Sequence, residues 1–488
     1  MFIIPRKVYL DHNATTPVAK PVIRTMTKTL KSVIGNASSL HTQGRVARGL
    51  IDQSRKTIAD ALAVRPDQII FTSGGTESNN AIIKGLFLQK GKGHIITSRI
   101  EHDSILGACR QVELLGGSVT YLPAKRDGRI SPEDILSAIQ PDTILISIMH
   151  ANNETGIIQP VDAIGRIANE KGIPFHTDAV QSFGKIDVNA DAIGCEFMTI
   201  TAHKINGPKG IGAMYWRGGA DWSPLLTGGD QERGQRTGTE SVHQIAGFAS
   251  ATDNILRRKE KEYTRLVELR RWFIQELGTI VPSCVVNEGP DQFQLPGTLS
   301  LTFPGKEGQR ILAGLDCYEI CVSIGSACTA DRIEPSHVLL GMGIDRMTAL
   351  STIRLSMGST TTKSEMKYTL RVLKYILSND PPGLQYLDPQ HLDRPRIQSD
   401  QTFIIDVRLP HERRLHPTIP GAQEWSILNF KRYFKRIPWD REVILICMTG
   451  VISFQAAYQL ANAGHPNVKV VYGGYSSWKS IHPEMHEQ

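Results

Sequence analysis

The fold of this chain is decided by the stretch Ile69-Ile70-Phe71-Thr72-Ser73-Gly74-Gly75-Thr76-Glu77-Ser78. Its first four residues predict a short buried strand, and the Gly-Gly turn that follows opens a helix. Four further apolar runs follow, each separated by enough chain for a helix, at residues 94–97, 119–122, 144–147 and 197–200. Strands that alternate with helices form βαβ units, so the sequence predicts an α/β fold with a mostly parallel sheet.

After these predicted strands, the spacing of apolar residues becomes helical, and a polar segment without apolar periodicity follows. Apolar residues at helical spacing predict a long amphipathic helix near 253–277. Another helix begins at Thr362, where Glu365 completes a capping box. Polar and proline-rich residues over 379–400 then predict a connection between domains. The βαβ rhythm restarts over 401–488, which is long enough for a small separate α/β domain.

Composition narrows the class of protein. The 488 residues exceed the roughly 250–300 that a single core usually reaches. The net charge of +7 is spread along the chain, without the basic stripe that direct nucleic-acid binding needs. No apolar run approaches the ~18 residues of a membrane span, and the N-terminus lacks an apolar signal segment. Seven cysteines, an odd number, do not make a disulfide framework. We therefore expect a cytoplasmic protein that binds neither membranes nor nucleic acid.

Four segments carry residues suited to catalysis. Free amides at the helix start near Gly75 and Thr76 attract a phosphate. Asp178 ends a presumed strand and could keep a ring nitrogen protonated. Lys204 lies between an apolar strand and a Gly-Pro loop, where burial could lower its pKa. Cys328 lies in a loop of small residues that could expose a thiol. Taken singly, each also has an ordinary interpretation: a turn, a helix cap, a surface lysine or a buried thiol.

Together these segments resemble one family, the cysteine desulfurases of the bacterial iron–sulfur and tRNA-thiolation type, which are fold-type I pyridoxal-phosphate enzymes. The resemblance runs from Tyr9 to roughly Leu377. Besides the segments above, it is carried by Tyr9-Leu10-Asp11-His12-Asn13-Ala14-Thr15-Thr16-Pro17, Gly35-Asn36-Ala37-Ser38-Ser39, Glu101-His102-Asp103-Ser104, His150-Ala151-Asn152-Asn153-Glu154-Thr155-Gly156, residues 231–240 (QERGQRTGTE) and Ile353-Arg354-Leu355-Ser356.

The resemblance implies pyridoxal 5'-phosphate as cofactor and assigns residues to it. Lys204 would hold the cofactor covalently, and Asp178 would pair with its ring nitrogen. His102 would stack on the ring and move protons, and Gln181 would contact the ring hydroxyl. The phosphate would lie against Gly75, Thr76, Thr201 and His203, with Thr239 reaching in from the partner subunit of a homodimer.

The resemblance also implies the reaction. Asn153 and Arg354 would bind the carboxylate of L-cysteine. The Cys328 thiolate would attack the substrate sulfur, so that alanine leaves and a persulfide remains for a sulfur-acceptor protein. A selenocysteine lyase or cysteine-sulfinate desulfinase on the same fold is the alternative, although the Gly325-Ser326-Ala327-Cys328 loop favours the desulfurase. We expect no metal site, because buried structural thiols account better for Cys317 and Cys321.

The C-terminal segment resembles a different family, the rhodanese domains. Asp406-Val407-Arg408, Ile419-Pro420-Gly421-Ala422, residues 447–453 (CMTGVIS) and residues 473–478 (GGYSSW) fall in that family's order. Cys447 would be the sulfur-carrying residue, with loop amides and a helix start directed at its sulfur. Val451 and Ile452 replace the polar residues usual in this loop, which leaves persulfide acceptance and a non-catalytic docking role both open.

The two resemblances predict the domain plan. We expect a desulfurase domain over 1–378, with a large cofactor-binding part at about 16–253 and a small part made of 1–15 plus 254–378. A linker at 379–400 would lead to a rhodanese-like domain at 401–488.

Overall fold

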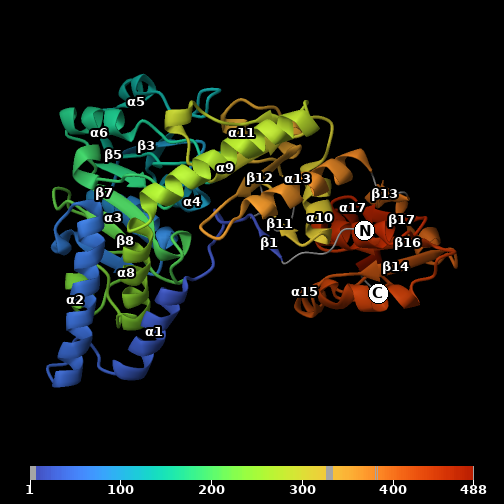
Figure 1. The fold of residues 1–488 in the computed structure, drawn as a ribbon, viewed down its shortest axis with the longest axis horizontal. Helices are drawn as coiled ribbons and strands as arrows, with labels where there is room; N and C mark the ends of the chain where they lie inside the picture. Colours follow the sequence, from blue (N-terminus) through green and yellow to red (C-terminus); the bar gives the residue numbers. More distant parts are fainter. Residues whose placement is uncertain (1–6, 326–333, 380, 382, 487–488) are drawn as a thin grey trace.

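The computed structural model describes residues 7–325, 334–379, 381 and 383–486. Figure 1 shows a large α/β body, a smaller α/β part beside it, and a third unit formed by the C-terminal residues. Cys328 lies outside the described residues.

The large body is built on a seven-stranded sheet in the order β2-β8-β7-β6-β5-β3-β4. Its strands are β2 (Ile69–Thr72), β3 (His94–Ser98), β4 (Ser118–Leu122), β5 (Thr143–Ser147), β6 (Phe175–Asp178), β7 (Phe197–Thr201) and β8 (Gly212–Trp216). All neighbours are parallel except β8, which runs antiparallel to both β2 and β7. The α/β fold and the strands expected at 69–72, 94–97, 119–122, 144–147 and 197–200 are therefore confirmed.

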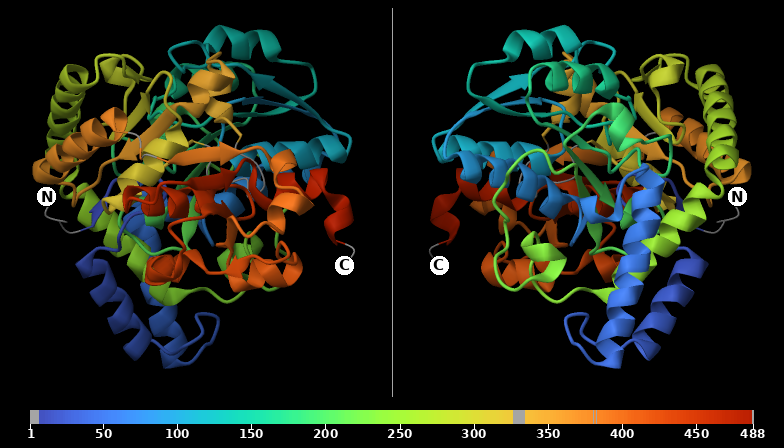
Figure 2. Two further views of the ribbon diagram at one scale, coloured as in Figure 1. Left: turned by 90° about the vertical axis from the view of Figure 1, so that its right-hand side faces the viewer. Right: turned by 90° about the vertical axis from the view of Figure 1, so that its left-hand side faces the viewer.

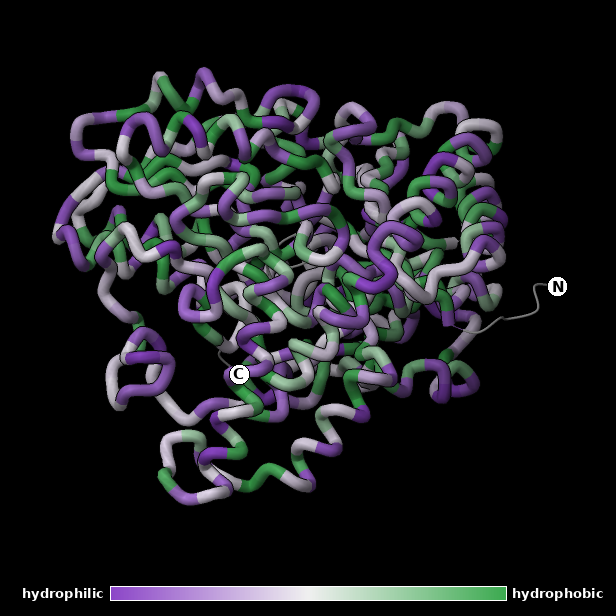
Figure 3. The backbone as a smooth tube through the Cα atoms, turned by 60° about the vertical axis from the view of Figure 1, so that its left-hand side comes forward, coloured by the Kyte–Doolittle hydropathy of each residue, from purple (hydrophilic) through white to green (hydrophobic). Residues whose placement is uncertain are grey.

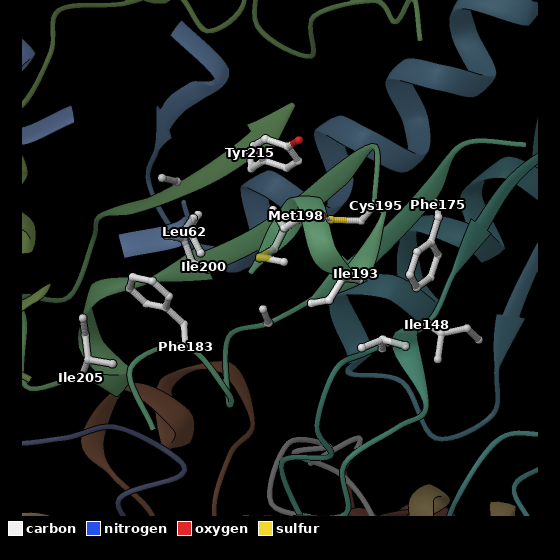
Figure 4. Packing of buried hydrophobic residues seen from close by; sticks show 14 of the residues in the cluster. Leu62, Ile148, Phe175, Phe183, Ile193, Cys195, Met198, Ile200, Ile205 and Tyr215 are labelled. Atoms are coloured by element: carbon white, nitrogen blue, oxygen red, sulfur yellow. Dashed lines mark hydrogen bonds between the residues drawn. The ribbon is translucent and has the colours of Figure 1, made fainter. Parts of the chain in front are cut away.

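Alternate residues of these strands supply two separate cores. Ile70, Ile95 and Leu145 pack on one side with α3 (Gly75–Lys90) and α4 (Asp103–Leu114). Ile96, Ile146 and their alternating neighbours pack on the other side with α2 (Thr42–Leu62), α6 (Val161–Glu170) and α8 (Val242–Leu256). Figure 4 shows this second core around Phe175, Met198 and Tyr215. A parallel sheet covered on both faces is apolar along whole strands, which explains the uninterrupted runs in the sequence. Short helices α5 (Pro132–Ala138) and α7 (Ala190–Ile193) complete this part.

The smaller part contains two sheets. Strands β12 (Thr352–Ser356), β10 (Thr298–Thr302) and β9 (Val285–Val286) form an antiparallel sheet, and β1 (Val8–Tyr9) pairs in parallel with β11 (Ile320–Cys321). Its helices are α9 (Lys259–Ile280), α10 (Gly308–Cys317), α11 (His337–Gly341), α12 (Arg346–Leu350) and α13 (Lys363–Ser378). The capping box predicted at Thr362 and Glu365 is present at the start of α13.

The helix predicted near 253–277 is two helices rather than one. Helix α8 ends at Leu256, and α9 begins at Lys259 after Arg258, whose φ of −119° leaves the usual helical range. The break falls in the charged run 257–262, which suits the exposed face of a helix as well as a connection, so that the pattern did not reveal it.

The C-terminal unit is a five-stranded parallel sheet in the order β13-β17-β16-β14-β15. Its strands are β13 (Leu384–Leu387), β14 (Thr402–Asp406), β15 (Gln423–Glu424), β16 (Glu442–Ile446) and β17 (Val468–Val471). Helices α14 (Arg394–Ile397), α15 (Pro410–Leu415), α16 (Val451–Asn462) and α17 (Gly474–Ile481) connect or follow them. Strand β13 lies within the segment expected as a linker. Its Leu384 and Leu387 are buried against this unit, and the surrounding prolines hid so short a strand from pattern analysis.

The C-terminal unit packs directly on the smaller part through helix α10, which Figure 1 shows beside it. Ala313 of α10 is buried in the core of the C-terminal unit. The Tyr386 hydroxyl donates a 2.7 Å hydrogen bond to Glu307, and Gln309 Nε2 donates a 3.3 Å bond to the Gly450 carbonyl. These contacts hold the C-terminal unit against the smaller part, beyond the covalent connection at 379–400 that the sequence predicted.

Helices α1 (Lys20–Ser32) and α2 project from the large body (Figure 2). Apolar and polar residues alternate along the projection (Figure 3), and several large apolar side chains there are exposed: Ile23, Leu30, Ile34, Leu40 and Val46. In the described part of the chain, no helix is both long and apolar enough to cross a membrane.

A buried ion pair anchors the loop that carries Thr239. Arg55 of α2 donates from both terminal nitrogens to Glu232, at 2.6 and 2.7 Å, and the backbone amide of Phe71 donates to the same carboxylate. Both side chains are almost fully buried, so neither can exchange its partner for water. The loop backbone takes positive φ angles at Glu232 and Arg233.

We predict that Glu232→Ala lowers the free energy of unfolding by about 3–5 kcal/mol, because the buried Arg55 cation loses its carboxylate and keeps a hydrogen bond to the neutral Ile69 carbonyl. Denaturant unfolding followed by circular dichroism measures the effect. Asp60→Ala is the matched control on α2, since it removes an exposed pair with Lys56 and should cost under about 1 kcal/mol. Equal losses in the two variants would contradict the anchoring role.

Candidate active site

The carboxyl ends of the parallel strands face a cavity of about 670 Å³. Polar side chains that follow four different strands line it: His102 after β3, Asn153 after β5, Asp178 at the end of β6, and Lys204 after β7. Open α/β sheets bind ligands at this edge, because loops from several strands converge there. Arg354 enters the same cavity from β12 of the smaller part.

Lys204 lies in the short 3₁₀ turn Ala202–Lys204 directly after β7. Its Nζ donates to the main-chain carbonyl of Ala14 at 2.8 Å and to that of Asn13. The N-terminal segment that contains Asn13 and Ala14 thus holds the Lys204 amine at the cavity wall. The next turn requires a positive φ of 63° at Asn206, a conformation that asparagine tolerates better than most residues.

Asp178 is held by donors rather than by a cation. Its Oδ2 accepts from Asn79 Nδ2 at 2.8 Å, and its Oδ1 accepts from the backbone amide of Val180 at 2.9 Å. Asn79 Nδ2 also donates to the Ser104 hydroxyl, which lies 2.9 Å from His102 Nδ1. A continuous polar network therefore joins the carboxylate to His102.

His102 caps helix α4 and remains exposed to the cavity. The backbone amide of Ser104 donates to His102 Nδ1 at 3.1 Å, so the neutral ring carries its proton on Nε2. This leaves Nε2 as the ring atom available to a ligand.

An anion cradle adjoins the main cavity at the start of α3. A hollow of about 380 Å³ is lined by Gly75, Thr76, Thr201, His203 and Lys209, among others. Strand β8 passes so close that a Cβ on Gly212 would lie 2.7 Å from the Cα of Gly74, which explains the small residues at this crossing. Free amides at a helix start favour phosphate.

His203 contributes to the cradle as a neutral imidazole. Burial, aided by the neighbouring cations Lys204 and Lys209, lowers the pKa of His203 to about 4. Its Nδ1 lies 3.2 Å from the hydroxyl of Thr15. The hydroxyl of Thr201 is buried and donates to the carbonyl of Ile211.

Asn153 and Arg354 lie together, as the sequence predicted they would if both bind one carboxylate. Arg354 donates to the Asn153 carbonyl at 3.0 Å and forms a 2.8 Å ion pair with Asp11. The buried Nε of Arg354 and the Oδ1 of Asn153 have no hydrogen-bond partner within the described residues. Unpaired buried polar atoms in a cavity wall are what a bound polar ligand would satisfy.

Two predicted residues are not placed in this cavity. Thr239 is exposed in the loop 231–240 and lines neither hollow. Cys328 lies outside the described residues. The residues on either side of it, Ser323–Gly325 and Glu334–Pro335, do line the cavity.

Three residues to which the sequence analysis gave no role lie at the site. Asn13 accepts hydrogen bonds from Lys204 and from Gln181, and Lys185 donates to Gln181 at 3.0 Å. Glu101 is fully buried beside His102, where burial raises its pKa to about 8. Sequence signals could have pointed to these residues. Asn13 and Glu101 lie in the segments that carry the family resemblance, and Lys185 follows Gln181 by four residues.

In the C-terminal unit, Cys447 lies at the end of β16. Its Sγ accepts from the backbone amides of Gly450 and Ser453, both at 3.2 Å, at the start of α16. The side chain is 1% exposed, so these amides and not water are its partners. Nearby, Arg408 and Asp406 form a fully buried ion pair beneath Tyr475.

Comparison with known proteins decides the family of the main body. Residues 8–368 match the family model of class-V aminotransferases. The chain belongs to this family. Residues 388–481 separately match the rhodanese-like domain.

Characterised relatives cover the class-V aminotransferase part of the chain. A cysteine desulfurase IscS of Dictyoglomus turgidum is 46% identical over 374 residues, which is 76% of this chain and 95% of that protein. A cysteine desulfurase IscS of Methanosarcina thermophila is 42% identical over the same share of this chain and 92% of its own.

Solved structures of related proteins have a similar fold over most of their length. A NifS-like protein aligns with a TM-score of 0.72 and 36% identity, over 76% of this chain and 99% of its own. SspA in complex with cysteine aligns with a TM-score of 0.65 and 37% identity, over 72% of this chain and 98% of its own.

Class-V aminotransferases depend on pyridoxal 5'-phosphate, and the residues of this site fit that cofactor. The donor set has an amine for a covalent bond, a carboxylate for a ring nitrogen, and a helix start with hydroxyls for a phosphate. In the described part of the chain, no cluster of three potential metal ligands occurs.

Proposed function

We propose that this protein is a pyridoxal-phosphate-dependent cysteine desulfurase, which converts L-cysteine to L-alanine and leaves the sulfur as a persulfide on Cys328. The observation that carries the proposal is the convergence of Lys204, Asp178 and the Asn153–Arg354 pair on one cavity. The names of the relatives support the same reaction.

When bound, the cofactor supplies an electron sink for charge that develops at the substrate Cα. In the proposal, Asp178 keeps the ring nitrogen protonated, and the Asn79 and Val180 donors keep that carboxylate oriented. Thr76, Thr201 and His203 hold the phosphate. Lys204 anchors the cofactor and then, released by the substrate amine, moves the Cα proton.

Substrate binding rests on the two-pronged geometry of arginine. In the proposal, Arg354 and Asn153 bind the cysteine carboxylate and hold the substrate sulfur in the cavity that Gly325 and Glu334 also line. The thiolate of Cys328 attacks that sulfur: an S–S bond forms, the substrate C–S bond breaks, and its electron pair passes to the bound three-carbon fragment. Protonation then gives alanine, for which His102 Nε2 is positioned as the proton donor.

The protein would act as a homodimer in the cytoplasm. Exposed apolar residues on the α1–α2 projection offer a surface for a second subunit, and Thr239 lines neither the main cavity nor the anion cradle. The six described cysteines are all free thiols, as suits a reducing compartment.

The rhodanese-like domain would accept the sulfur. The two amides directed at Cys447 Sγ are suited to hold a negatively charged sulfur, which favours a relay from Cys328 to Cys447 over a purely docking role. The relay would end on a separate acceptor protein for iron–sulfur cluster assembly or thio-modification.

We predict that Lys204 carries the cofactor covalently. Borohydride reduction followed by denaturation should leave cofactor attached to the native protein and none attached to Lys204→Ala, as measured by peptide mass spectrometry. Lys209→Ala is the control, because that lysine lines only the cradle. Reduced cofactor retained on the Lys204→Ala chain would rule out the assignment.

We predict that Cys328→Ser separates substrate binding from sulfur release. The variant should bind the cofactor and change its visible spectrum on adding cysteine, while alanine production falls by at least about 100-fold, because the attacking thiolate is gone. Cys317→Ser is a suitable control, since burial raises the pKa of that thiol to about 12. Full turnover by Cys328→Ser would favour the selenocysteine lyase or desulfinase alternative.

We predict that two inactive variants complement each other in mixed dimers. Thr239→Asp would repel the phosphate in the neighbouring subunit's site, and Lys204→Ala would disable its own site. A heterodimer then keeps one intact site, so an equal, re-equilibrated mixture should recover about a quarter of native activity. No recovery, with heterodimers detected by native mass spectrometry, would place Thr239 outside the partner's site.

We predict that Cys447 receives sulfur from Cys328. After cysteine is added, alkylation and mass spectrometry should detect persulfide on Cys447 in the native protein and none in Cys328→Ser. Cys317→Ser again serves as the control. A Cys447 that stays unlabelled while Cys328 is fully persulfidated would leave the rhodanese-like domain as a docking module.

A further inference from the structure

Lys185 is a half-buried lysine next to the active site for which the proposed reaction has no use. It lies in the turn that follows β6, four residues after Gln181. Its Nζ donates to Gln181 Oε1 at 3.0 Å and approaches Asn13 Oδ1 at 3.4 Å. Both acceptors line the cavity proposed for the cofactor.

Lys185 itself does not line that cavity. It lines a smaller hollow behind it, together with His12, Asn13 and Lys204. Asn13 and Lys204 line both spaces, whereas Gln181 lines the main cavity and accepts a hydrogen bond from Lys185, which lines the smaller hollow. Any effect of Lys185 on a bound ligand therefore passes through its neighbours or through its charge.

The chemistry of an amine decides how the Gln181 amide is oriented. A protonated lysine only donates hydrogen bonds, so the carbonyl oxygen of Gln181 must face Lys185 and the amide nitrogen must face away from it. One of the two Nε2 hydrogens is used by the Asn13 carbonyl, 3.0 Å away. The second remains available on the cavity side.

We propose that Lys185 is a positioning residue that fixes Gln181 as a hydrogen-bond donor toward the ring oxygen of pyridoxal 5'-phosphate. The proposal rests on the proposed function, which places that cofactor in the cavity. Without Lys185, the Gln181 amide keeps the Asn13 carbonyl as an anchor but loses the partner of its own carbonyl oxygen, so it is held less firmly as a donor toward an anionic ring oxygen.

The electrostatic surroundings are compatible with this role. Burial lowers the pKa of Lys185 to about 7, with the cations of Lys204 and Arg354 acting in the same direction. The neutral amine still has two N–H donors, enough for Gln181 and Asn13, and the Asn13 carbonyl, which accepts from Gln181 Nε2, favours the same amide orientation in both charge states. His12, whose pKa is lowered to about 4 chiefly by burial, shares the rear hollow with Lys259 and Glu262.

The consequence is measurable in the bound cofactor. A donor at the ring oxygen stabilises its anionic form and lowers the pH at which the visible absorption of the protein-bound cofactor titrates. Loss of the donor should raise that midpoint by about one pH unit, the size expected for one hydrogen bond to a charged group.

The experiment is a spectroscopic pH titration of the cofactor-loaded protein without substrate. Lys185→Met should raise the midpoint by about one unit, and Lys185→Arg, which keeps the donors, should restore the native value. Lys259→Met is the matched control, because that lysine lines the same rear hollow but pairs with Asp187. Circular dichroism checks that each variant is folded.

A double-mutant cycle separates orientation from charge. Gln181→Leu should raise the midpoint by itself, and adding Lys185→Met to it should produce no further rise. Equal shifts for Lys185→Met in both backgrounds would show a direct charge effect and overturn the proposal, as would a native midpoint in Lys185→Met. If the native protein shows no visible band that depends on Lys204, the proposed function itself fails, which is a different outcome.

Discussion

The active site depends on the hydrogen bonds made by one N-terminal residue, Asn13. Its carbonyl oxygen accepts from Lys204 and Gln181, and its side chain donates to the Asn153 carbonyl and to Thr298 at 3.1 and 2.9 Å. These partners come from loops of the large sheet and from β10 of the smaller part. Because buried polar groups must be paired, displacing this segment would leave donors of the large body and an acceptor of the smaller part without their partners.

The two parts supply different chemistry to the cavity that Asn13 spans. The large sheet provides the groups suited to a cofactor, since each follows the carboxyl end of a strand whose position the core fixes. The smaller part provides Arg354, which is held by Asp11 and by the carbonyl of Asn153. A substrate that bridges the two parts therefore meets Arg354. This cation comes from the smaller part but is held by Asp11 of the N-terminal segment and by Asn153 of the large body.

The rhodanese-like domain packs against helix α10 of the smaller part. Gln309 reaches the carbonyl of Gly450, whose own amide donates to Cys447 Sγ. Ala313 is buried in the core of that domain, and Arg310 lies over the ring of Phe454. The loop around the second cysteine is thus in direct contact with the smaller part. The rhodanese-like domain therefore has a defined orientation relative to the smaller part. A flexible linker alone would allow a broad range of orientations.

The sequence by itself determined the α/β fold, the order of the strands along the chain and the two families, and it predicted the lysine and carboxylate of the site. These follow from local signals: apolar runs of strand length, glycine turns before helices, and short segments whose residue types are tied to one chemistry. The sequence did not locate the break after Leu256 or strand β13, because the charged run at the first also suits an exposed helix face and proline-rich composition masks the second. Only the tertiary structure decided that Asn13 joins the two halves of the cavity, that Lys185 lies behind Gln181, and that α10 receives the C-terminal domain. The contacts of Asn13, including the one with Lys185, and those of α10 join elements that are far apart in the sequence. Whether such elements touch depends on how the sheets and helices pack, which no local sequence pattern encodes.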